Sequence, residues 1–130
     1  MLSEDLVVHF IALGALTALG SDVMIGAKAT IPKGAGPYTV FVDTGGTMSL
    51  KTHDYELRRP EVQVSVRASL SSICRAKAQE LRNLVGDGWY NVTINGTFYE
   101  KIIAVQEVMD LQQDGAGRPK FGFNLTSLHE

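Results

Sequence analysis

The segment Glu61-Val-Gln-Val-Ser-Val-Arg-Ala68 constrains the fold of this 130-residue chain more than any other part of it. Its side chains alternate strictly in polarity, which is the two-residue period of a β-strand. The apolar set is Val62, Val64, Val66 and Ala68, and the polar set is Glu61, Gln63, Ser65 and Arg67. A strand with two such faces belongs to a sheet that packs on a core with one side and meets water or a partner with the other.

Two helices are predicted beside this strand. The first begins at a cap provided by Ser3 or Asp5, runs for about four turns and ends before Gly20. Its apolar stripe is continued by apolar or small residues on the other faces, whereas a surface helix of a monomer normally has a polar face. Either the helix lies inside the domain or a neighbouring subunit covers its second face. We favour the neighbour, which makes Val7 and Ile11 candidate inter-subunit residues.

The second helix is capped by one of three serines and ends near Gly86. The candidate caps are Ser69, Ser71 and Ser72, and the predicted inward face comprises Ile73, Cys74, Ala78, Leu81, Leu84 and Val85. Charged and amide side chains occupy the opposite face, as in an amphipathic helix that lies on a sheet.

Further strands are predicted on both sides of this helix. They cover Asp22 to Ile25, Tyr38 to Asp43, Trp89 to Ile94, Thr97 to about Met109, and Arg118 to Leu125. Asn95-Gly96 is a strong hairpin signal, and the adjacent apolar Ile102 and Ile103 indicate a bulge or a strand buried on both faces. The order of elements predicts one α+β domain over residues 1–130, an antiparallel or mixed β-sheet with two helices packed on it.

A long polar loop is predicted between Asp43 and Pro60. Loops of this length in compact domains commonly bind a partner or become ordered on docking. The candidate docking residues are Thr47, Lys51, His53, Tyr55, Arg58 and Arg59, together with Arg67 on the polar face of the following strand. We favour ion pairs within the protein or across a subunit boundary over a phosphate site for the arginines, since basic residues elsewhere do not converge on them.

Composition and motifs argue against several classes of protein. The formal net charge is −2 and the basic residues are scattered, unlike a duplex-binding face. His9, His53 and His129 are far apart, and no cysteine or carboxylate stands at metal-ligand spacing beside them. The single cysteine, Cys74, is expected to pack in the core. We therefore expect no catalytic residues, no metal and no cofactor.

The apolar stretch from Leu6 to Leu19 is expected to be a packed helix. It follows acidic residues where a signal peptide would have basic ones, and it is too short to span a bilayer. No membrane partner is expected.

Four pieces of the sequence carry a resemblance to a known family. They are Arg58-Arg-Pro-Glu-Val-Gln-Val-Ser-Val-Arg67, the helix with Ala76, Ala78, Leu81 and Leu84, Val92-Thr-Ile-Asn-Gly-Thr-Phe-Tyr99, and the segment from Asp110 to Leu125. In order and spacing these pieces resemble the tail terminator (tail completion) proteins of long-tailed bacteriophages, also known as phage minor capsid proteins. The resemblance covers most of the chain after Tyr55.

This resemblance implies a non-enzymatic structural protein of the virion, assembled in the host cytoplasm. Such subunits form a hexameric ring that caps the head-proximal end of the tail tube, stops its growth and presents a surface to the neck. The implied partners are further copies of the chain, the tail tube protein and a neck or head-completion protein, while DNA passes through the lumen without specific binding.

Two other readings remain open from the sequence. A head-tail connector adaptor or stopper in the neck is also a small ring protein with docking loops. A nucleic-acid-binding sheet module, with Phe98, Tyr99, Phe121 and Phe123 as stacking residues, is the more remote alternative, because these aromatics alternate as core residues do.

Overall fold

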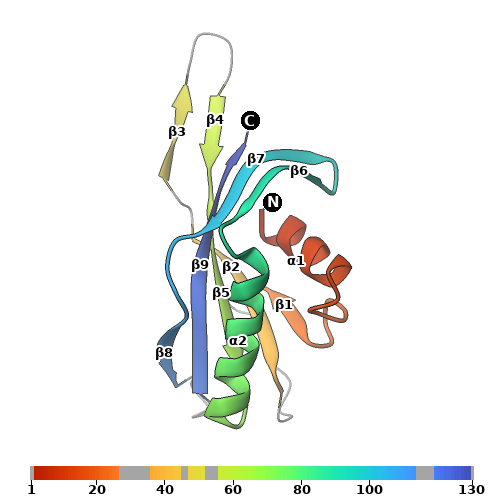
Figure 1. Ribbon diagram of the computed structural model, residues 1–130, viewed down its shortest axis with the longest axis vertical. Coiled ribbons are helices and arrows are strands. Elements are labelled where there is room, and N and C mark those ends of the chain that lie inside the picture. The colour runs from red at the N-terminus through yellow and green to blue at the C-terminus, as the bar shows by residue number, and fades with distance from the viewer. Residues whose placement is uncertain (1, 27–35, 45–46, 52–55, 114–118, 130) are drawn as a thin grey trace.

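A computed structural model describes residues 2–26, 36–44, 47–51, 56–113 and 119–129 (Figure 1). These residues form two helices and nine strands. The helices are α1 (Leu2–Ala12) and α2 (Ser71–Val85). The strands are β1 (Val23–Ile25), β2 (Tyr38–Asp43), β3 (Thr47–Lys51), β4 (Glu56–Arg59), β5 (Glu61–Arg67), β6 (Trp89–Ile94), β7 (Thr97–Ala104), β8 (Met109–Gln113) and β9 (Pro119–His129).

Strand β9 is the centre of the sheet. It pairs antiparallel with β5 and β4, and also with β7 and β8. Strand β2 continues the sheet from β5, and β1 joins β2 in parallel. Strand β6 adds to β7, and β3 adds to β4. The predicted α+β class is confirmed, and the sheet is mixed.

Both helices share one hydrophobic core with one face of this sheet. Val62, Val64 and Val66 of β5 are completely buried in it, as the alternating sequence predicts. From α1, the Phe10 ring lies 5.8 Å from that of Phe41 and 5.4 Å from that of Trp89, measured between centroids. Figure 1 shows α2 along the middle of the sheet and α1 near β1 and β6. The helices therefore form one layer on one side of the sheet.

Helix α1 is shorter than predicted. It has 11 residues and ends at Ala12, well before Gly20. Gly14, with a φ of 81°, reverses the chain, and the Ala15 N–H donates to the Phe10 carbonyl oxygen at 3.1 Å. A glycine in the left-handed region is a common helix terminator, and here it overrides the apolar run that follows.

Helix α2 has the predicted extent, but its cap and its inner face differ from the prediction. The N-cap position is Leu70, which makes no side-chain capping bond, so none of the three serines caps the helix. Ile73 and Leu84 are exposed instead of inward, at 41% and 37%. The buried stripe is narrow and consists of Cys74, Ala78, Leu81 and Val85.

The Asn95-Gly96 hairpin is confirmed, with φ angles of 50° and 84°. The expected irregularity is also present, as a register shift between Tyr99 and Lys101 in the pairing of β7 with β9. The single strand predicted from Thr97 to Met109 is wrong, because β7 ends at Ala104 and β8 begins at Met109. His129, expected in a frayed tail, lies in β9.

The long loop predicted between Asp43 and Pro60 is also wrong. Strands β3 and β4 pair antiparallel there, with Thr47 opposite Arg59 and Lys51 opposite Glu56. The alternation of Met48 and Leu50 with polar residues has the period of a strand, but the polar composition of the segment obscured it. At its base the Thr44 N–H donates to the Glu61 carbonyl oxygen at 2.9 Å.

Candidate interaction surfaces

The hairpin formed by β3 and β4, called here the β3–β4 arm, holds most of the predicted docking residues. Thr47 and Lys51 belong to β3, and Arg58 and Arg59 belong to β4. His53 and Tyr55 lie outside the described residues. Figure 1 shows the arm projecting beyond the body of the sheet. Only Arg58 of β4 is aligned with β9, opposite His129, so the arm is anchored at one end.

Of the two candidates on α1, Val7 is buried and Ile11 is half-buried. Val7 is 3% exposed and belongs to the core, and Ile11 is partly buried against it. The expectation that a neighbour covers Val7 is corrected, since the chain itself covers it, whereas for Ile11 the expectation stays a prediction. Val8 and Leu13, at 45% and 46% exposed, are the residues near α1 that face outward.

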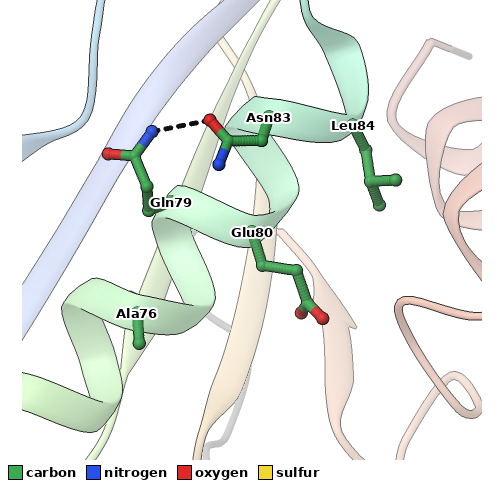
Figure 2. A pocket seen from close by; sticks show the side chains of 5 residues that line it. All are labelled: Ala76, Gln79, Glu80, Asn83 and Leu84. Atoms are coloured by element: carbon green, nitrogen blue, oxygen red, sulfur yellow. Dashed lines mark hydrogen bonds between the residues drawn. The ribbon is translucent and has the colours of Figure 1, made fainter.

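Several exposed large aliphatic residues belong to the two helices or to the segments beside them. We call this set the helix-layer surface; it comprises Val8, Leu13, Leu19, Leu70, Ile73 and Leu84. A shallow, open depression of about 540 Å³ runs along α2 beside Ala76, Glu80 and Leu84. Figure 2 shows Glu80 and Leu84 projecting from the same side of α2, away from the hydrogen-bonded pair Gln79 and Asn83.

A second apolar set lies on the side of the sheet opposite the helices. Residues that face each other across an antiparallel pair share one side of the sheet. Tyr90 is opposite Lys101, Phe98 is opposite Thr93, and Met109 is opposite Gly122. Each of these pairs alternates along its strands with pairs that pack on the helices, so all three pairs face the other side of the sheet. Val105 lines a depression of about 240 Å³ on this side with Ile103 and Glu61. We call Tyr90, Phe98, Val105 and Met109 the outer sheet face.

Arg67 lies at one end of this same side of the sheet. It is opposite Tyr38 on β2 and opposite Lys120 on β9. Its Nε atom is buried and has no hydrogen-bond partner. A buried, unpaired donor on a charged group is costly, and like charges in facing positions add to the cost. The structure therefore places one predicted docking residue where its buried Nε atom lacks an acceptor.

A polar cluster ties α1 to the β6–β7 hairpin. The Asp5 side chain is 5% exposed and accepts hydrogen bonds from the Tyr99 hydroxyl and from Asn95 Nδ2. Next to it, Ser3 Oγ donates to Asp43 Oδ2 at 2.6 Å. Burial and the neighbouring Asp5 carboxylate raise the pKa of Tyr99 above its ordinary value, which keeps the phenol protonated as a donor. These hydrogen bonds join α1 to the β6–β7 hairpin and to the end of β2.

His9 and Cys74, whose side chains could in principle take part in chemistry, are packed against other parts of the chain. The His9 ring lies 4.5 Å from the Trp89 ring in an edge-to-face arrangement, and burial lowers the pKa of His9. Cys74 is buried, and its thiol donates to the Val66 carbonyl oxygen at 2.8 Å. Burial raises the pKa of Cys74, which disfavours the reactive thiolate.

The four aromatic residues considered for stacking on nucleic-acid bases are not all accessible. Tyr99 and Phe123 are 1% and 0% exposed, so their rings are closed to bases. Phe98 is exposed, but the other predicted members do not join it at the surface. Stacking on single strands needs several accessible rings along a basic groove.

No group of metal-ligating side chains occurs among the residues that the structure describes. Neither described helix has the length and hydrophobicity needed to cross a lipid bilayer. Comparison of the sequence with protein-family models gave no match, and neither did comparison with curated proteins.

Proposed function

We propose that this chain is a structural subunit of a bacteriophage tail, a tail terminator whose copies form a hexameric ring at the head-proximal end of the tail tube. The sequence pieces that resemble this family include the end of β4 with β5, the helix α2, the β6–β7 hairpin, and β8 with β9. These elements make up the central part of the fold, in contact with one another. The fold is therefore compatible with the one that the resemblance implies.

The β3–β4 arm is the observation that carries the proposal. It projects from the body of the sheet and bears Thr47, Lys51, Arg58 and Arg59 along its length (Figure 1). A projecting hairpin can offer its backbone edge to a second protein without disturbing the core. In the proposed function the arm contacts the terminal ring of the tail tube, and the opposite end of the ring lacks the surface on which another tube ring would stack.

Removing the arm is expected to abolish binding to tail tubes while the domain still folds. Deleting residues 47–59 leaves Gly45-Gly46-Pro60 as a short connection at a base where Thr44 and Glu61 are already hydrogen-bonded. The measurement is cosedimentation of the deletion variant with purified tail tubes, with circular dichroism as the check on folding. Undiminished capping by a folded variant contradicts the role of the arm.

Electron microscopy of particles that lack this protein distinguishes the role of tail terminator from the role of neck adaptor. Overlong tails in electron micrographs indicate a terminator, since nothing then stops polymerisation. Tails of normal length that do not join heads indicate an adaptor. The proposed position in the virion is abandoned if the second result is obtained.

A further inference from the structure

Asn95 and Gly96 form the two-residue turn between β6 and β7, and both residues are exposed. Their φ angles are 50° and 84°, and a Cβ atom added to Gly96 would have no described atom within 4 Å. The closing pair of this hairpin is Ile94 and Thr97, so the Gly96 N–H lies outside the ladder of paired strands. The backbone nitrogen that follows Asn95 is therefore open and has no side chain beside it.

The amide of Asn95 also holds the hairpin to α1. Its Nδ2 atom donates to Oδ1 of Asp5 at 3.4 Å, and the Tyr99 hydroxyl donates to the other oxygen of the same carboxylate. Asp5 belongs to α1 and is 5% exposed. A carboxylate at position 95 would have no N–H to donate, and it would bring a second negative charge to a buried one, where charges interact more strongly than in water. The link between α1 and the hairpin thus depends on residue 95 remaining an amide.

We propose that Asn95 is a site of spontaneous deamidation, and that the carboxylate formed there loosens α1 from the β6–β7 hairpin. In this reaction the Gly96 backbone nitrogen attacks Cγ of Asn95, a C–N bond forms, and the bond from Cγ to Nδ2 breaks. Ammonia leaves with the proton of the Gly96 nitrogen, and water then opens the five-membered imide to aspartate or isoaspartate. The reaction is independent of the proposed function, because it takes place within a single copy of the chain.

The other asparagines of the chain are less suited to the same attack. Asn83 and Asn124 are followed by leucine and Asn91 by valine, so a bulky side chain stands beside the nitrogen that would react. Asn91 is the best-matched comparison, because it is exposed, has the same φ of 50° and lies in the adjoining strand β6. Glycine puts the fewest steric limits on the rotation that ring closure requires when a turn opens locally. We therefore expect the reaction at Asn95 first.

Mass spectrometry of the aged full-length chain tests the reaction. The wild type is held for weeks in a warm, mildly alkaline buffer, in which the attacking nitrogen loses its proton more readily, and peptide mapping locates the mass gain of deamidation. We expect this gain at Asn95 to be about tenfold faster or more than at Asn91, a difference of about 1.4 kcal/mol in the barrier. Gly96→Ala is expected to slow it. An Asn95 that stays an amide, equal rates at the two asparagines, or a rate that Gly96→Ala leaves unchanged overturns the assignment.

Asn95→Asp imitates the product, and Asn91→Asp adds the same charge outside the polar cluster as the matched control. We expect the melting temperature of Asn95→Asp to be about 5 °C below that of the wild type. The melting temperature of Asn91→Asp is expected to be unchanged, since water surrounds its side chain. In an Asp5→Asn background, Asn95→Asp should lose most of its effect, because the like charge is gone. Equal melting temperatures for the two aspartate variants contradict the coupling between position 95 and Asp5.

Trp89 reports whether α1 itself is loosened. It is the single tryptophan of the chain, and its ring centroid lies 4.5 Å from that of His9 and 5.4 Å from that of Phe10, both on α1. Quenching of its fluorescence by acrylamide is expected to rise in the aged wild type and in Asn95→Asp, but not in Asn91→Asp. Quenching that stays at the level of the fresh wild type while the melting temperature falls would show that the new charge destabilises the fold without loosening α1, and would refute that part of the proposal.

Discussion

Replacing Gly122 with alanine is expected to lower the free energy of unfolding by about 3 kcal/mol. Gly122 lies in the middle of β9, opposite Ser65 on β5 and opposite Met109 on β8. A Cβ atom there would lie far inside van der Waals contact of the Val64 carbonyl oxygen and 3.0 Å from Ser65 Cα. Because these are backbone atoms of the neighbouring strand, relief of the clash requires β5 and β9 to separate.

Gly96→Ala is the matched control for this variant. Gly96 has a φ of 84°, but nothing lies within 4 Å of its added Cβ, so only backbone strain of about 1 kcal/mol is expected. Urea unfolding followed by circular dichroism compares the two variants. A loss at Gly122 no larger than that at Gly96 contradicts the close approach of β5 and β9.

Removing the Tyr99 hydroxyl is expected to cost about 2 kcal/mol of stability. Tyr99→Phe keeps the ring, which is 1% exposed, and takes away a hydrogen bond to the buried Asp5 carboxylate. Asn95 Nδ2 still donates to the other oxygen of that carboxylate, Asp5 Oδ1, at 3.4 Å. A buried carboxylate with an unmade hydrogen bond bears most of this cost.

Tyr90→Phe isolates the effect of burial. The Tyr90 hydroxyl donates to the Asp87 carbonyl oxygen at 3.2 Å, but the residue is 59% exposed, so water replaces the lost bond. We expect a change below about 0.5 kcal/mol for this variant. Equal losses for Tyr90→Phe and Tyr99→Phe in thermal unfolding would show that Asp5 and Tyr99 do not form a buried link between α1 and the hairpin.

The parts of the fold that local patterns determine could be predicted from the sequence. The alternation in β5, the apolar spacing of α2 and the Asn95-Gly96 turn each report on a few neighbouring residues, and each is found where expected. The end of α1 depends on the left-handed conformation of Gly14, which an otherwise apolar run conceals. The β3–β4 pairing depends on contacts between strands, which composition alone does not reveal.

The candidate surfaces were harder to predict, because exposure is a property of the packed molecule. Val7 and Val8 are adjacent and chemically identical, yet one is buried and the other is 45% exposed. The register of β6 with β7 places Tyr90 and Phe98 on the outer side of the sheet, and no sequence signal fixes which side the helices cover. Arg67 was found from its position in the alternating strand, but the missing acceptor of its Nε atom is visible only in the structure.

Cryo-electron microscopy of purified tail tubes incubated with this protein tests the central claim most directly. The account predicts a single ring of six copies at one end of each tube, with the β3–β4 arms directed toward the last ring of tube subunits. Tubes that remain bare at both ends, or single copies bound without contact to one another, would contradict it.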